Sequence, residues 1–320
     1  MARTLQEIDY LLMVDDEARQ GALRFAERPG GAFLADAGAV KIPPLVELPR
    51  LLSAAEHVVD DTESEEDLRL LLAPGSSLGG ARPKASIRDV DGRLAIAKFP
   101  HEGDEIDIVL WEAVALSMAG KAGITIPEWR LEYPGKKPVL ILRRFDREGE
   151  TRIPFLSSMS MLNAIDNEQR SYMEFCDVLR QCGSRPREDM RMLWRRIVFS
   201  ILISNTDDHL RNHGFLNAGP AGWCLAPAYD LNPVPVDIKP RVLSTAIDFD
   251  DATASMDLAF EVAPYFELTR TEANEIAFEV GAAVDLWREI AKGLGLGKGK
   301  IERMASAFEH EDRKKAGLRT

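Results

Sequence analysis

The 320-residue chain has little of what marks several protein classes. It contains three cysteines, Cys176, Cys182 and Cys224, with no Cys-x-x-Cys pair and an odd total, which disfavours a disulfide framework and a four-cysteine zinc site. It also lacks an excess of positive charge, because its formal net charge is −12. A protein that coats nucleic acid through the phosphates needs a basic face, so this class is disfavoured and only a local basic groove is left open.

Long apolar runs are absent as well. No run approaches the roughly 20 apolar residues that a bilayer-spanning helix needs, and the N-terminus turns acidic at Asp15-Asp16 before a signal-like apolar region develops. We therefore expect a soluble, cytoplasmic protein with reduced cysteines. A hydrophobic content of 45% is enough for a sizeable core, and the length favours two domains or lobes.

The pattern along the chain changes from strand-like to helix-like. Alternating residues around Asp91-Gly92 predict a β-hairpin with a type I′ turn. A helix is predicted over 107–123 and strands over 129–133 and 139–142, and beyond Arg147 the helical segments lie near 171–183, 188–204, 271–293 and 300–315. This order predicts an α+β protein with an N-terminal segment (1–74), a small β-rich lobe (75–147) and a larger helical lobe (148–320).

A polar stretch, Asn205 to Phe215, follows the apolar run that ends at Ile203. Polar residues after a helix usually form a surface loop, and that is the default reading of any one of them. Asp207 and Asn212, however, have the D-x-x-x-x-N spacing of a kinase catalytic loop, in which the Asp accepts a hydroxyl proton and the Asn binds Mg²⁺. The segment that begins at Gly222 reads as an apolar strand ending in Asp230, a second oxygen ligand for Mg²⁺.

Two upstream features fit the same chemistry. The glycine-rich run 75–81 has backbone N–H groups that could approach phosphates, and Lys98 lies in an apolar strand on the same face as Leu94 and Ile96. Taken alone, Lys98 would be interpreted as a lysine at a strand edge with its ammonium in solvent. Glu112 in the next helix could pair with Lys98, but an ordinary surface position explains it equally well. Together these residues follow the order found along a two-lobed kinase.

These motifs resemble the HipA-type serine/threonine kinases, which are toxins of bacterial toxin–antitoxin pairs. The resemblance covers nearly the whole chain and rests on the motifs at 9–16, 77–84, 144–147, 205–212 and 227–231. It implies a two-lobed, protein-kinase-like fold that binds ATP and Mg²⁺ between its lobes.

The resemblance also implies a role for each matching residue. Asp207 would be the catalytic base, Asn212 and Asp230 the Mg²⁺ ligands, and Lys98 the lysine that binds the nucleotide. The strand ending at Phe145 would be the hinge that contacts adenine, although Arg143 stands where the family often has an acidic residue. The remaining nucleotide contacts would come from Ser77, Gly79, Gly80, Ala81, Lys84, Arg143, Arg144, Phe145, His209, Arg211 and Tyr229.

Regulation and partners follow from the same resemblance. Ser77, next to Ser76, would be autophosphorylated, which would eject the glycine-rich turn because a phosphate of charge about −1.5 to −2 repels the nucleotide phosphates. The alternative is that Ser77 only makes turn hydrogen bonds. The implied partners are a helix-turn-helix antitoxin that contacts DNA, a protein substrate such as an aminoacyl-tRNA synthetase, and a separate small protein that supplies the further N-terminal subdomain of longer members.

Three other functions remain open from the residues alone. His209 and His213, with Asp207 or Asp208, could bind zinc in a hydrolase, although this leaves Lys98 and the glycine-rich run unexplained. A small-molecule phosphotransferase would use similar base and metal spacing. A kinase-like module without catalysis could bind an antitoxin in a repressor complex.

Overall fold

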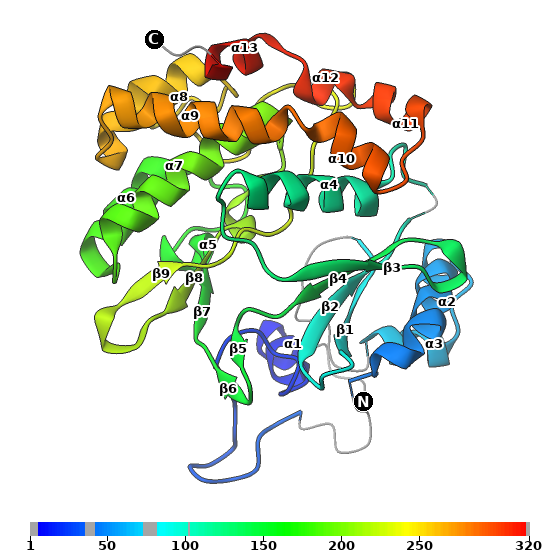
Figure 1. The fold of residues 1–320 in the computed structure, drawn as a ribbon. Helices are drawn as coiled ribbons and strands as arrows, with labels where there is room; N and C mark the ends of the chain where they lie inside the picture. Colours follow the sequence, from blue (N-terminus) through cyan, green and yellow to red (C-terminus); the bar gives the residue numbers. More distant parts are fainter. Residues whose placement is uncertain (1–5, 36–41, 73–81, 102, 318–320) are drawn as a thin grey trace. The chain divides into compact units, whose positions relative to one another are not determined.

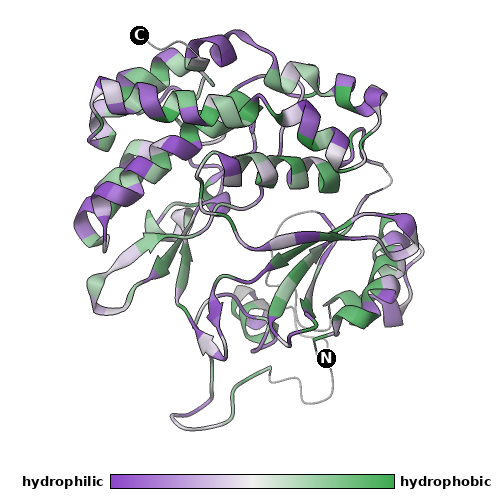
Figure 2. Ribbon diagram, in the orientation of Figure 1, coloured by the Kyte–Doolittle hydropathy of each residue, from purple (hydrophilic) through white to green (hydrophobic). Residues whose placement is uncertain are grey.

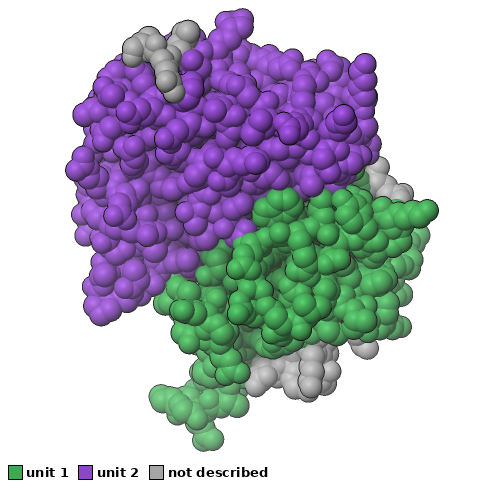
Figure 3. Space-filling view, in the orientation of Figure 1, with its two compact units in different colours: residues 1–109, 128–154 green, residues 110–127, 155–320 purple. Residues whose placement is uncertain are grey.

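The computed structural model describes residues 6–35, 42–72, 82–101 and 103–317 (Figure 1). The chain forms two compact units (Figure 3): unit 1 comprises 1–109 and 128–154, and unit 2 comprises 110–127 and 155–320. The stretch 110–127, inside the predicted small lobe, thus groups with the helical residues. The division at 74 and 147 stays a prediction about the sequence.

Unit 1 is built on an antiparallel sheet of four strands. In the order β1-β2-β4-β3 these are Lys84–Arg88, Leu94–Lys98, Val139–Arg143 and Trp129–Glu132, which confirms the hairpin and the two strands predicted after it. The predicted type I′ turn is wrong. Gly92 has φ 79° and donates its N–H to the carbonyl of Asp89, while the Asp89 N–H bonds to Arg93, so the loop has three central residues with glycine in the left-handed position.

One face of this sheet packs against two helices, α2 (Leu48–Val59) and α3 (Glu65–Leu72). Alternate strand residues supply the packed face: Ala85, Ile87, Ala95, Ala97, Val139 and Ile141. Since side chains alternate along a strand, Ile96 and Lys98 lie on the opposite face. The register places Lys84 directly across from Lys98, so two lysines share that face.

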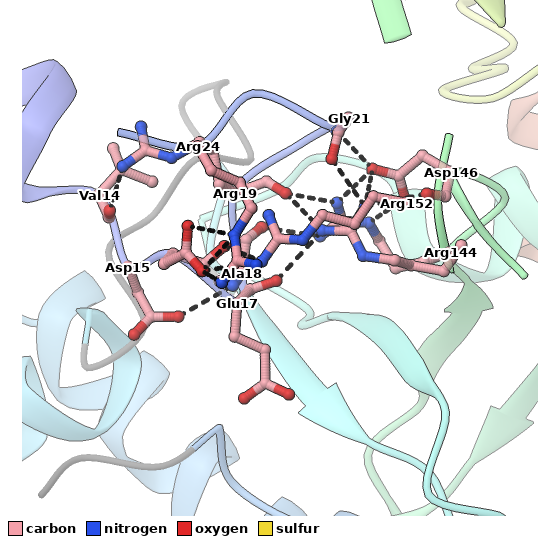
Figure 4. Close-up of polar contacts among 12 residues, drawn as sticks. Val14, Asp15, Glu17, Ala18, Arg19, Gly21, Arg24, Arg144, Asp146 and Arg152 are labelled. Atoms are coloured by element: carbon pink, nitrogen blue, oxygen red, sulfur yellow. Dashed lines mark hydrogen bonds and ion pairs between the residues drawn. The ribbon is translucent and has the colours of Figure 1, made fainter. Parts of the chain in front are cut away.

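Within unit 1, an N-terminal arm contacts the residues that follow β4 (Figure 4). It comprises helix α1 (Glu7–Met13) and residues 14–35, and it meets the hairpin formed by β5 (Arg147–Glu148) and β6 (Thr151–Arg152). Asp146 accepts hydrogen bonds from Arg144 Nε (2.7 Å), Arg147 Nη1 (2.9 Å) and the Gly21 N–H (2.7 Å). Burial would raise the pKa of Asp146, but the two arginines hold it below its usual value.

A second carboxylate completes this contact. Asp16 is buried and ion-paired with Arg24, and its carbonyl accepts a hydrogen bond from Arg152 Nη2 (2.6 Å). Two motifs that lie far apart in the sequence, DDEARQGALR from Asp15 and RFDR from Arg144, therefore form one buried network. The role of these residues in the structure is to fasten the arm to the sheet.

Unit 2 is mostly helical. A small sheet has the order β7-β8-β9, with strands Phe155–Ser157, Gly214–Asn217 and Trp223–Leu225. The helices are α4 (Ile108–Lys121), α5 (Ser158–Met161), α6 (Tyr172–Cys182), α7 (Pro186–Ile203), α8 (Met256–Val262), α9 (Arg270–Val284), α10 (Trp287–Gly293), α11 (Lys298–Arg303), α12 (Ala305–Phe308) and α13 (Glu311–Gly317). Short 3₁₀ turns are η1 (Leu45–Glu47) and η2 (Pro134–Lys136) in unit 1, and η3 (Leu210–Asn212), η4 (Gly219–Ala221) and η5 (Ala263–Phe266) in unit 2.

The predicted helices of unit 2 are confirmed, with two interruptions. The segment 271–293 breaks between α9 and α10, and 300–315 forms three short helices. The capping box at the start of α9 is present: the Glu272 N–H bonds to Thr269 Oγ1 at 3.2 Å, and the Thr269 N–H bonds to Glu272 Oε2 at 2.8 Å. In Figure 2, α13 is mostly hydrophilic, whereas α4 and the sheet of unit 1 carry many apolar residues.

Across the described ranges, no helix combines the length and the apolar character that crossing a membrane requires.

Candidate active site

The polar stretch begins at an anchored helix end. Helix α7 is buried over most of its length, and Ser204 ends it in a left-handed conformation with φ 53°. The hydroxyl of Ser204 donates to the carbonyl of Ala307 (2.9 Å), and Arg241 Nη2 donates to the last-turn carbonyl of Ile201 (3.0 Å). These bonds satisfy groups that a helix end leaves unpaired, so the loop that follows starts from a fixed position.

Two hydrogen bonds join this loop to the residues on both sides of Asp230. On one side, Tyr229 donates its hydroxyl to the carbonyl of Arg211 (2.7 Å). On the other side, the buried amide of Asn205 accepts a hydrogen bond from the Asn232 N–H (3.1 Å). These bonds fasten the chain segment that contains Asp230 to the loop that carries Asp207 and Asn212.

The route to Asp230 differs from the predicted one. Strand β9 ends at Leu225, so Asp230 is not a strand residue, and its φ of 58° is left-handed. Asp tolerates this conformation better than most residues do. Two α7 side chains hold the end of the strand, because Asp189 Oδ2 accepts from the Leu225 N–H (3.2 Å) and Arg196 donates to the carbonyl of Ala226 (2.6 Å).

The spacing of Asp207 and Asn212 has a direct structural basis. The 3₁₀ turn η3 brings Asn212 back over the start of the loop, and its Nδ2 donates to the backbone carbonyl of Asp207 at 2.7 Å. The Asp207 side chain is 57% exposed. The structure thus presents the carboxylate of Asp207 to solvent on a backbone that Asn212 braces, and the metal contact of Asn212 stays a prediction.

The next residue, Asp208, faces the interior. Its carboxylate accepts hydrogen bonds from the Tyr172 hydroxyl and from the Ser244 N–H (2.7 Å), and its carbonyl accepts from Thr245 Oγ1 (2.7 Å). Burial outweighs these hydrogen bonds and raises the pKa of Asp208 to about 6. The enclosure of Asp208 by Tyr172, Ser244 and Thr245 was not predicted, because these residues are distant in sequence and form no pattern with Asp208.

The two histidines do not form the arrangement that the zinc alternative requires. His209 precedes η3 with an extended backbone, ψ 164°, and His213 lies after it in a buried site, 3.1 Å from the Asp208 carbonyl through Nε2. Burial lowers the pKa of His213 to about 3. No group of three or more His, Cys, Asp or Glu side chains suited to a metal ion occurs in the part of the chain that the structure describes.

Three further predicted site residues belong to unit 2: His209 and Arg211, expected beside the phosphates, and Tyr229, expected beside Asp230. Arg211 forms an ion pair with Asp166, both being more than half exposed. Tyr229 has its pKa raised by burial and then by the neighbouring charge of Asp230. Nδ1 of His209 is buried without a hydrogen-bond partner. The nucleotide contacts of these residues stay predictions.

The other predicted residues belong to unit 1, apart from Glu112, or lie outside the described residues. Lys84 and Lys98 share one face of the sheet, whereas Glu112 belongs to unit 2, so its pairing with Lys98 stays a prediction. Ser76, Ser77, Gly79, Gly80 and Ala81 lie outside the described residues.

The predicted hinge already uses two of its backbone donors. The N–H groups of Arg143 and Arg144 bond to the carbonyls of Glu128 (2.9 Å) and Leu94 (3.1 Å). The side chain of Arg143 pairs with Asp91, and that of Arg144 is buried against Asp146. The adenine contacts predicted for Arg143, Arg144 and Phe145 stay predictions.

Residues 76–289, more than half of the chain, match the family model described as the HipA-like C-terminal domain. The chain belongs to this family. Among curated relatives, it is 24% identical over 195 residues to "Putative kinase Y4mE" of Sinorhizobium fredii, covering 52% of this chain and 43% of the relative. A second relative, named "Putative kinase", from Haemophilus influenzae is 26% identical over 151 residues, covering 42% of this chain and 43% of the relative. The HipA-like chain thus spans less than half the length of either protein.

Two solved structures share the fold. The HipA chain in a complex of HipA, HipB and operator DNA from Shewanella oneidensis MR-1 has a TM-score of 0.64 at 18% identity, covering 93% of this chain and 74% of that one. The proinflammatory kinase CtkA of Helicobacter pylori has a TM-score of 0.55 at 14% identity, covering 73% and 92%. The predicted α+β, HipA-type kinase-like fold is therefore confirmed.

Proposed function

We propose that this HipA-like chain is a protein kinase that transfers the γ-phosphoryl group of ATP to a serine or threonine hydroxyl. The observation that carries the proposal is the pair of hydrogen bonds on either side of Asp230, from Tyr229 to Arg211 and from Asn232 to Asn205. They fasten the segment that contains Asp230, a second acidic residue, to a loop with the D-x-x-x-x-N spacing. The kinase-like fold and the names of the two curated relatives support it.

In this proposal Asp207 is the base. Its carboxylate accepts the proton of the acceptor hydroxyl while the hydroxyl oxygen bonds to the γ-phosphorus, and the bond to the β-phosphate oxygen breaks so that ADP leaves with the electron pair. The exposure of Asp207 suits contact with an external acceptor. The bond from Asn212 to its carbonyl fixes the backbone, so little reorganisation is needed at the moment of reaction.

Asn212 and Asp230 fit a magnesium ion. Mg²⁺ prefers oxygen ligands and is usually held by one or two carboxylates together with substrate phosphates, so one amide and one carboxylate are a sufficient protein contribution. Because Asn212 donates through Nδ2 to Asp207, its amide is oriented with the oxygen as ligand atom. When bound, the ion would neutralise charge on the phosphates. Lys98 stays the residue that we propose to bind the nucleotide.

Regulation and partners extend the proposal. Ser77 would be the site of autophosphorylation, with Ser76 as the neighbouring alternative. The solved HipA chain is in a complex with HipB and operator DNA. By analogy we propose a helix-turn-helix antitoxin as partner, DNA contact only through that antitoxin, and a toxin that inhibits growth by phosphorylating a protein such as an aminoacyl-tRNA synthetase.

The test is phosphoryl transfer from radiolabelled MgATP to protein acceptors. Asp207→Asn should lower transfer by about 10²- to 10⁴-fold, the usual contribution of a general base. The matched control Asp237→Asn changes an exposed aspartate that is ion-paired with Arg303, and it should leave transfer unchanged. Equal activity of Asp207→Asn and wild type would refute the assignment. Label on a sugar or amino alcohol alone would indicate a small-molecule phosphotransferase, and ATP binding without transfer would indicate a kinase-like binding module.

Autophosphorylation has its own readout. After incubation with MgATP, the intact mass of the wild type should rise by one phosphate, and Ser77→Ala and Asp207→Asn should both abolish the increase. Ser76→Ala is the matched control and should keep it. An unchanged mass increase in Ser77→Ala would reject Ser77 as the modified residue.

A further inference from the structure

The segment after Asp230 returns to the candidate catalytic loop. The Val234 N–H donates to the carbonyl of Ser204 (3.2 Å), and a turn follows in which the N–H groups of Ile238 and Lys239 both bond to the carbonyl of Pro235 (3.0 and 3.2 Å). This turn directs one cation toward the loop. The ammonium of Lys239 donates to the carbonyl of Thr206 at 3.2 Å.

The same ammonium lies beside the candidate base. Lys239 Nζ is 3.9 Å from Asp207 Oδ1, and the two side chains are 43% and 57% exposed. Because both groups are about half exposed, water and salt screen the attraction, and the pair contributes little to folding stability. The ion pair can therefore matter mainly through the orientation that it gives to the carboxylate of Asp207.

We propose that Lys239 is a positioning residue for phosphoryl transfer. Held by the carbonyl of Thr206, its ammonium keeps the carboxylate of Asp207 in the orientation that accepts the hydroxyl proton. This inference rests on the proposed function. Lys239 keeps all its protons in the reaction: the acceptor proton moves to Asp207, the hydroxyl oxygen bonds to phosphorus, and ADP leaves.

Lys239 is not needed to hold the segment after Asp230 on the loop, because other side chains already make that connection. The hydroxyl of Ser244 donates to the same carbonyl of Thr206 (2.9 Å). Arg241 binds the end of α7 through the carbonyl of Ile201 (3.0 Å) and pairs with Asp312 (2.7 Å). The segment therefore stays fastened without Lys239, and what is lost with Lys239 is the cation next to Asp207.

The experiment compares four variants in steady-state ADP release, with MgATP and dephosphorylated casein as the acceptor probe. Lys239→Met should lower kcat by about 10-fold or more, as expected when a reacting group is misoriented, with the KM for ATP within about twofold. Lys239→Arg should recover most of the loss because it keeps a cationic donor. Ser244→Ala removes the other bond to Thr206 and should cost less than about threefold. Lys292→Met changes an exposed lysine of α10 and is the control.

Each outcome decides between two readings. A kcat of Lys239→Met equal to that of wild type overturns the positioning role. So does an equal fall in Lys239→Met and Ser244→Ala, or no recovery in Lys239→Arg, since either indicates a tether. If wild type transfers no phosphoryl group and Asp207→Asn behaves identically, the proposed function fails first and the role of Lys239 falls with it.

Discussion

Removing the carboxylate of Asp146 should test the network that fastens the N-terminal arm. Asp146 accepts two hydrogen bonds from Arg144, one from Arg147 and one from the Gly21 N–H. Side-chain exposure is 3% for Arg144, 4% for Asp146 and 9% for Arg147. In Asp146→Asn one oxygen remains for these donors, and two buried guanidinium groups lose their counter-charge. Breaking a buried ion pair on one side costs about 3–5 kcal/mol, a large part of a typical stability of about 5–15 kcal/mol.

The assay is urea unfolding at pH 7 combined with hydrogen exchange of the backbone at residues 16–24. Asp146→Asn should lower the free energy of unfolding by about 3 kcal/mol and speed exchange in the arm. The matched control is Asp91→Asn, whose ion pair with Arg143 is more exposed, with side chains 37% and 24% exposed, and which should cost less than about 1 kcal/mol. A loss below about 1 kcal/mol in Asp146→Asn, or unchanged exchange in the arm, would refute the reasoning.

The stabilisation that Asp146 provides should depend on pH, and the direction of the change follows from its pKa. The arginines hold the pKa of Asp146 below its usual value, so its stabilising contribution is present above the unfolded pKa of about 3.9 and is lost as pH falls through the folded pKa. The stability difference between wild type and Asp146→Asn should therefore be constant from about pH 5 to 8 and shrink below about pH 4. A difference that grows on acidification would contradict the assigned ion pairs.

Three further predictions concern the loop. Burial raises the pKa of Asp208 to about 6, so the contribution of this group to the free energy of unfolding is lost as pH rises from about 4 to 6. Burial lowers the pKa of His213 to about 3, so its contribution is lost as pH falls below about 6.5. These two pH dependences offset each other between about pH 4 and 6. Asp208→Asn should therefore make the free energy of unfolding rise more steeply with pH than in wild type, by about 1.4 kcal/mol per pH unit. Equal slopes for the two proteins, measured by urea unfolding at several pH values, would contradict this prediction. Asn205→Ala leaves the N–H of Asn232 without its acceptor, which should lower the free energy of unfolding by about 1–3 kcal/mol and raise the magnesium concentration needed for half-maximal activity. An unchanged magnesium dependence would show that Asn205 does not act on the proposed metal site. Tyr229→Phe loses one hydrogen bond to a carbonyl and should cost about 1 kcal/mol by thermal unfolding, with a larger loss pointing to packing.

Local sequence signals located most elements of the fold. The alternation around Gly92 and the helical periodicity of 107–123 and 188–204 are properties of adjacent residues, and the structure has β1, β2, α4 and α7 there. The break between α9 and α10 was not foreseen, because the segment 271–293 has a continuous helical pattern. At the break the N–H of Asp285 still bonds to the carbonyl of Gly281, while that of Leu286 bonds to the carbonyl of Ala283, which tightens the chain at two residues that are neither glycine nor proline.

The candidate site shows where sequence reasoning stops. The spacing of Asp207 and Asn212 was readable because both belong to one short loop. Asp230 was also named from the sequence, but its local structure was not predicted, because it depends on a left-handed residue and on hydrogen bonds from Tyr229 and Asn232 to partners distant in sequence. Lys239 was missed for the same reason: a lysine after Pro235 has no pattern of its own, and only the turn brings it beside Asp207.

The adjacent carboxylates Asp207 and Asp208 explain why a buried helix is followed by so polar a loop. One is exposed and faces the proposed acceptor, and the other is enclosed by Tyr172, Ser244 and Thr245. A shift of the loop by one residue would bury the carboxylate of Asp207 and leave the donors around Asp208 without an acceptor, and both changes are costly in a low-dielectric interior. The buried network therefore fixes the register of the loop, and through the register it fixes which of the two carboxylates is exposed.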